Sequence, residues 1–139
     1  MGYLHEFKIG TSVAGLAPLP WWNISWPDDW PYQPWSRVET RGNGHKAGFG
    51  YPVVTWLYDN MGQAMLWRFL NLLDSEDDAS VNVYIRTYKD WAVRLDPANF
   101  LAIMHRPIDG SGKQLHARVH PMRAAYSGVS ISFTHLEEQ

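Results

Sequence analysis

Histidines and serines are the side chains of this chain best suited to a metal site or to catalysis, but their positions in the sequence argue against both roles. Six histidines occur among 139 residues. His116 and His120 stand four apart, and on a helix they would share a face that suits zinc. Their neighbours alternate with period two, which predicts a strand and places the two rings about 13 Å apart. That distance is too long for one metal ion, so we expect solvated or hydrogen-bonded histidines and no metal site.

Catalytic groups are equally sparse. Ser111 and Ser127 lack the strand-turn-helix context of an activated serine, and the acidic run at 74–78 (DSEDD) is simpler to explain as a solvated turn than as a paired acid and base. The glycine-rich segment 41–50 (RGNGHKAGFG) lacks the ending of a phosphate-binding P-loop. The sequence therefore predicts a protein that is not an enzyme and that carries no cofactor.

Composition narrows the class further. The chain has no cysteine, which removes disulfides and thiolate sites and suits assembly in a reducing interior. A net charge of −2 lacks the basic excess of a nonspecific DNA binder. The sequence shows neither a signal-peptide pattern nor a run of eighteen apolar residues. We expect a soluble, unprocessed single domain over 1–139, with no membrane partner.

Tryptophan is the residue that stands out. Five of eight tryptophans fall within fifteen residues, among prolines that oppose a helix and favour extended backbone; they are Trp21, Trp22, Trp26, Trp30 and Trp35. The segment 17–35 is therefore predicted to be a long extended arm. Three interpretations remain open: the arm folds back over its own core as a large loop, it crosses to a neighbouring subunit, because it can reach roughly 60 Å, or it presents indoles to sugars or single-stranded bases.

The other elements indicate a mainly β protein with one helix. Apolar residues recur at spacing four, after Asn60 as N-cap, and predict a helix over about 60–73 that lies on a sheet. Alternation with period two predicts strands around 53–58, 81–86, 91–95, 100–105, 115–119 and 129–134. We expect an antiparallel β-sandwich or barrel flanked by that helix, with an exposed, flexible glycine-rich loop at 41–50.

Three segments carry a resemblance to a known group. An aromatic strand leads through a polar cap into a helix (GFGYPVVTWLYDNMGQAMLWRFLNLL, 48–73), a strand contains Tyr-Ile-Arg-Thr (VNVYIRTY, 81–88), and a later strand ends in Met-x-x-Pro (ANFLAIMHRP, 98–107). In this order they resemble small virion proteins of long-tailed bacteriophages. The resemblance implies the tail-tube type of fold, whose subunits form hexameric rings that stack around a DNA channel, and it brings no catalytic residues.

The resemblance implies a structural subunit of a phage tail, in the first place the tube, with distal-tail, tail-completion and terminator proteins as relatives of the same fold. The implied partners are further copies, other tail proteins, and DNA only as passing cargo, in a virion tail assembled in the host cytoplasm. The competing class is a Trp-rich carbohydrate-binding module.

Two sets of residues are expected to act in such an assembly. The subunit interface is expected to use the five arm tryptophans together with residues of the glycine-rich segment, namely Arg41, His45, Lys46 and Phe49. An acidic channel lining lets a polyanion slide without sticking. That role is assigned to Asp74, Glu76, Asp77 and Asp78.

Overall fold

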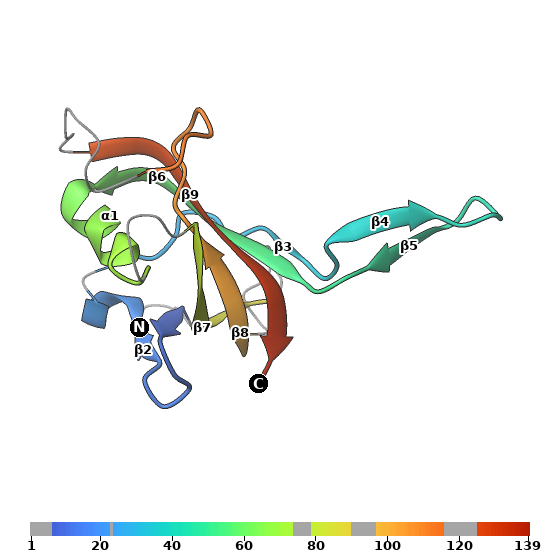
Figure 1. Cartoon of the computed structure of the whole chain (residues 1–139), viewed down its shortest axis with the longest axis horizontal. Helices are drawn as coiled ribbons and strands as arrows, with labels where there is room; N and C mark the ends of the chain where they lie inside the picture. Colours follow the sequence, from blue (N-terminus) through green and yellow to red (C-terminus); the bar gives the residue numbers. More distant parts are fainter. Residues whose placement is uncertain (1–6, 23, 74–78, 90–96, 116–124) are drawn as a thin grey trace, which may run out of the picture.

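One antiparallel sheet of seven strands organises the molecule, and a separate two-stranded hairpin projects from it (Figure 1). The structure is a computed structural model that describes residues 7–22, 24–73, 79–89, 97–115 and 125–139. The sheet order is β2-β1-β7-β8-β9-β6-β3. The elements in chain order are β1 (Lys8–Gly10), β2 (Ala17–Pro18), the 3₁₀ helix η1 (Leu19–Trp22), β3 (Tyr32–Gln33), β4 (Arg37–Thr40), β5 (Lys46–Phe49), β6 (Val53–Gly62), α1 (Gln63–Leu70), β7 (Ser80–Tyr88), β8 (Pro97–His105) and β9 (Ala125–Glu138). A mainly antiparallel β fold with one α-helix among the described residues confirms that part of the expectation.

Strict alternation gives the sheet one buried face. Along the longest ladder the inward residues pair directly: Val54 with Phe133, Trp56 with Ile131 and Tyr58 with Val129, all of them buried. The outward residues between them are polar except for Leu57, and the hydroxyls of Thr55 and Ser132 lie 3.4 Å apart. A single apolar face of this kind must be covered, because a sheet packs its hydrophobic side away from water.

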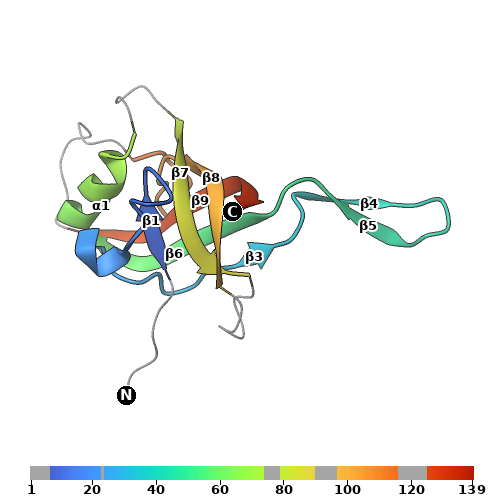
Figure 2. The same cartoon turned by 90° about the horizontal axis from the view of Figure 1, so that it is seen from below.

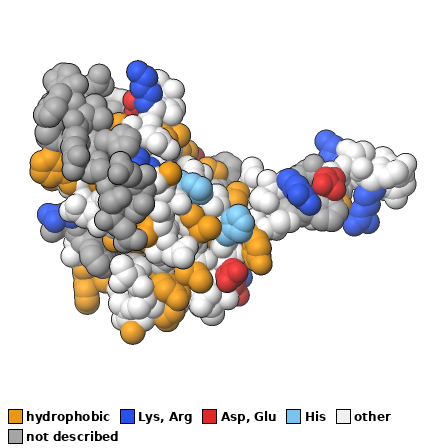
Figure 3. Space-filling model, viewed as in Figure 1, with side chains coloured by type: hydrophobic (Ala, Val, Ile, Leu, Met, Phe, Trp, Pro, Cys, Tyr) orange, Lys and Arg blue, Asp and Glu red, His pale blue; other side chains and the backbone are white. Residues whose placement is uncertain are grey.

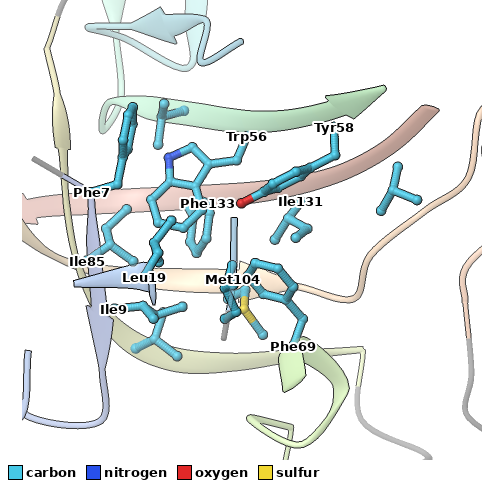
Figure 4. Packing of buried hydrophobic residues seen from close by; sticks show 14 of the residues in the cluster. Phe7, Ile9, Leu19, Trp56, Tyr58, Phe69, Ile85, Met104, Ile131 and Phe133 are labelled. Carbon is cyan, nitrogen blue, oxygen red and sulfur yellow. The ribbon is translucent and has the colours of Figure 1, made fainter. Parts of the chain in front are cut away.

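The sheet covers that face by curling. Three strand spacings separate β6 from β7 in the sheet order, which would be about 14 Å in a flat sheet. Yet the indole Nε1 of Trp56 on β6 donates a hydrogen bond of 3.2 Å to the hydroxyl of Thr87 on β7. Phe7, just before β1, lies edge-on against Trp56 at 5.7 Å. The two sides of the sheet therefore meet around these aromatic rings (Figure 4).

Helix α1 closes one end of the core. It follows β6 directly, and Phe69 packs on Tyr58 with ring centroids 6.0 Å apart. The expected N-cap, Asn60, is wrong: that residue lies in β6 opposite Ser127, and Gly62 precedes the helix without a side-chain cap. The ladder with β9 runs on to Gly62, so a paired strand, not a capping loop, leads into the helix.

The Trp/Pro segment packs on its own domain instead of extending as a free arm. The amides of Asp28 and Asp29 donate to the carbonyl of Leu57, and β3 then pairs with the start of β6. The expectation that no helical turn forms here is also wrong, because η1 includes Pro20. Proline is tolerated in a first helical turn, where its missing N–H has no bond to make.

Some expected elements cannot be compared with the structure. The strand at 91–95 and most of the strand at 115–119, with His116 and His120, lie outside the described residues. Residues 109–112 form a turn, in which the amide of Gly112 donates to the carbonyl of Asp109 at 3.0 Å.

Replacing Thr87 with valine tests the contact across the core. Thr87 is fully buried and accepts the indole hydrogen of Trp56, so Thr87→Val keeps the shape but leaves that donor without its acceptor. We expect the free energy of unfolding in urea to fall by about 1 to 3 kcal/mol. The matched control, Thr55→Val on the outer face, should change it by less than about 0.5 kcal/mol. Equal losses in both variants would contradict the role given to this hydrogen bond.

Candidate interaction surface

Strands β4 and β5 form a hairpin, residues 37–49, that stands apart from the sheet. They pair from Arg37 with Phe49 to Thr40 with Lys46. The flexible glycine-rich loop expected at 41–50 is therefore wrong in its second half, which is strand β5. Gly44 and Gly50 take positive φ values of 87° and 89°, so these two glycines make the turns at either end of β5.

The hairpin lacks support from the rest of the chain. Both views show it pointing away from the sheet (Figures 1 and 2). Within the described part of the chain, β4 and β5 pair only with each other. An isolated two-stranded hairpin is marginally stable in water. A partner surface would therefore add substantially to the order of this segment.

Charge along the hairpin is mostly basic (Figure 3). The hairpin carries three basic residues, Arg37, Arg41 and Lys46, and one acidic residue, Glu39. All four side chains are exposed. The ion pair between Arg37 Nε and Glu39 Oε1, 3.3 Å long, is too exposed to contribute more than a few tenths of a kcal/mol. The whole chain has twelve basic and fourteen acidic residues. Outside the hairpin, nine basic and thirteen acidic residues therefore remain.

A tryptophan covers the root of the hairpin. An added Cβ on Gly48 would lie 2.2 Å from Cδ2 of Trp35, so the indole rests directly on the glycine backbone of β5. Aromatic cover of a strand glycine in this way stabilises the local ladder. Trp35 is still 41% exposed, and Tyr51, where the chain returns from the hairpin, is 49% exposed. The root therefore carries open aromatic surface.

The structure divides the tryptophans expected at an interface into two kinds. Trp30 is only 4% exposed and packs on Phe7 and Tyr88 at ring distances of 5.1 and 6.0 Å. Trp26 is half-buried, 6.3 Å from the ring of Phe7. These two serve the core of their own chain, which is the first of the three interpretations of the arm. An interface role fits only the exposed indoles.

A second apolar surface lies at the opposite end of the molecule from the hairpin, around η1 and α1 (Figure 1). Trp21 is 79% exposed and Trp67 on α1 is 42% exposed. The amide of Ser25 donates to the sulfur of Met65 at 3.2 Å, which ties this part of the arm to the helix. A shallow hollow of about 370 Å³ lies beside it, lined by Pro20, Ile24, Ser25 and Trp26.

Several expected interface and channel residues cannot be placed. The side chains of Trp22 and Phe49 are outside the described part of the structure, as is the whole acidic run with Asp74, Glu76, Asp77 and Asp78. Arg41, His45 and Lys46 are described, and all three lie exposed on the hairpin.

A β-bulge brings two histidines to the hairpin root, a juxtaposition that sequence reasoning missed. The register of β8 against β9 shifts between Leu101 and Ile103, and His135 on β9 has a φ of 52°. Its ring lies 5.4 Å from that of Tyr51, and the neighbouring His105 Nε2 lies 2.8 Å from the Thr134 hydroxyl. Burial, with a smaller contribution from His135, lowers the pKa of His105 below its usual 6.5. His105 and His135 are thirty residues apart in the sequence, and no local sequence pattern connects them.

In the ranges that the structure describes, no three His, Asp or Glu side chains gather where they would hold a metal ion. None of the described helices is both long and apolar enough to cross a membrane.

Substitutions at His135 test the bulge. Left-handed backbone is costly for a β-branched residue but tolerated by asparagine. His135→Val should therefore lower the free energy of unfolding by about 1 to 2 kcal/mol, whereas His135→Asn should leave it within about 0.5 kcal/mol. Denaturant melts of both variants supply the measurement. Similar values for valine and asparagine would argue that the backbone at this position carries no such constraint.

Comparisons with protein-family models, with curated proteins and with solved structures find no match to this chain.

Proposed function

We propose that the protein is a structural subunit of a phage tail, in the first place the tail tube, whose copies form hexameric rings that stack around a DNA channel. Other tail proteins are its further partners, DNA is passing cargo, and the virion tail is its location. On this proposal the curled sheet with its single helix is the β-sandwich or barrel of tail-tube proteins. The contact between Trp56 and Thr87 across the core supports such a closed form.

The hairpin is the observation that carries the proposal. It is extended, exposed along its length and paired with no other described strand. A marginal element of this kind is expected to order fully against a partner. Because its backbone edges and side chains face outward, a neighbouring copy can pack along it without disturbing the core of either subunit.

The position of the aromatic surfaces favours assembly of identical copies. Trp35 and Tyr51 stand at the hairpin root, whereas Trp21 and Trp67 lie at the other end of the molecule. Contact between two different surfaces of the same protein is heterologous, and such contacts generate closed rings or open stacks. Both arrangements belong to the proposed tube.

Charge supports the same pairing. The hairpin is basic, while the rest of the chain has an excess of four acidic residues over basic ones. A basic projection that meets an acidic surface of the next copy gains in encounter rate and register. The acidic residues at 74–78 remain the proposed lining of the channel.

Charge reversal on the hairpin tests the proposal. Arg41→Glu and Lys46→Glu change exposed side chains, so circular dichroism should stay unchanged. We expect each to weaken self-association at least about tenfold, which equals about 1.4 kcal/mol. Sedimentation velocity and negative-stain micrographs would report the loss of rings and stacks that the unaltered protein forms.

Lys113→Glu is the matched control, because Lys113 is equally exposed but lies in the turn after β8, away from the hairpin. It makes the same change in net charge and should leave assembly intact. An unaltered protein that stays monomeric at high concentration, and whose tryptophan fluorescence is quenched by oligosaccharides, would overturn the proposal in favour of a carbohydrate-binding module.

A further inference from the structure

A hollow with several polar side chains in its wall lies at the root of the hairpin, next to the aromatic surface described above. It has a volume of about 500 Å³ and is lined by Ser36, Arg37, Gly50, Tyr51, Val53, His105, Thr134 and His135. A volume of this order falls in the range of small-ligand sites. The lining comes from the hairpin, the start of β6, and the ends of β8 and β9, so four elements meet here.

The lining carries the guanidinium of Arg37, the imidazoles of His105 and His135, and the phenol of Tyr51. Among the described residues that line the hollow, none is acidic. Two carboxylates lie on the strands that supply the lining: Glu39, paired with Arg37 Nε, and Glu137, an exposed residue two positions after His135. The hydroxyls of Ser36 and Thr134 add hydrogen-bond donors.

The bulge is what gathers these groups. A φ of 52° at His135 is an uncommon conformation for a residue other than glycine. Bulges often re-aim a side chain where a site is formed. Here the extra residue sets the His135 ring against Tyr51, while Thr134 holds the ring of His105 at 2.8 Å. Two imidazoles thus lie close enough to influence each other's charge.

We propose that this hollow binds a carboxylate group, held by Arg37 at the rim and by His105 and His135 in their protonated forms. A planar carboxylate suits a guanidinium and imidazolium donors, since charge-assisted hydrogen bonds are the strong ones. A small free acid and the acidic side chain of a protein present the same group.

The proposal sets the direction of the pH dependence. Without ligand, the pKa of His105 is held below its usual value by burial and by His135, so this ring is neutral at neutral pH. A bound carboxylate favours the charged form of the His105 ring and raises its pKa. Affinity therefore increases as pH falls through the pKa of His105, and it falls again below about pH 4.5, where the carboxylate itself is protonated.

The test follows the histidine ring protons by NMR during pH titrations, with and without acetate. We expect acetate to raise the pKa of His105 and to shift the ring-proton signals of His135, and to leave the ring-proton signals of His45, at the hairpin tip, unchanged. The affinity for acetate should be at least about threefold higher near pH 5.5 than near pH 7.5, because protonation of one ring adds a positive charge that attracts the carboxylate. The second ligand to be tested is N-acetylglutamate amide, which resembles an acidic side chain in a protein. If it binds more tightly than acetate, the natural source is a protein side chain. If it binds equally or more weakly, the natural source is a free acid.

Variants separate the site from general screening. Arg37→Gln should weaken acetate binding at every pH, whereas His135→Asn, which suits the same backbone, should weaken it mainly at low pH. Lys113→Gln removes an exposed cation elsewhere and should change nothing. The proposal is overturned if neither carboxylate moves the pKa of His105 or the ring-proton signals of His135, if the signals of His45 shift equally, or if Arg37→Gln binds like the unaltered protein.

Discussion

The contact between Trp56 and Thr87 is the constraint on which the rest of this fold depends. It joins strands that stand three places apart in one sheet, so it exists only if the sheet curls until its two sides meet. Once they meet, the aromatic face is shielded from water, and Phe7 and Trp30 fill the seam beside Trp56. The stabilisation comes from burying several large rings, each of which removes roughly 150 to 250 Å² from water. The hydrogen bond adds little by itself, but it gives the buried indole an acceptor that it would otherwise lack.

That closure explains why the Trp/Pro segment stays on its own subunit. The segment lies along β6 through the bonds of Asp28 and Asp29 to Leu57, and its indole at position 30 enters the seam. Its reach is therefore used to cover the sheet edge, which would otherwise expose unpaired backbone groups. The chain then leaves the sheet at Trp35 and returns at Tyr51, and the residues between form the projecting hairpin. Among the described residues, exposed tryptophans remain at both ends of this segment, at Trp21 and at Trp35.

Local patterns in the sequence predicted the strands well, because period two follows directly from which side chains face the core. Val129, Ile131 and Phe133 are buried as their alternation indicates. Local patterns did not predict the structure where a residue type suits two different elements. Asn60 suits a helix cap, but it pairs with Ser127 and so extends strand β6 instead. Glycine content suggested a loop at 41–50, although only Gly44 and Gly50 make turns and the residues between them pair with β4. The hollow at the hairpin root depends on a register shift in β9, which no spacing in the sequence reveals.

Arg37 links the two proposed surfaces, because it begins β4 and also lines the hollow. A carboxylate that holds this guanidinium restricts the root of the hairpin, and a docked hairpin in turn restricts the guanidinium. Two binding events that order the same residue assist each other, and this coupling is reciprocal: each raises the affinity of the other by the same factor. If a neighbouring copy supplies the carboxylate, the two events become one interface with a proton-dependent strength. If a free acid supplies the carboxylate, its binding in the hollow regulates how well the hairpin is ordered for contact with its partners.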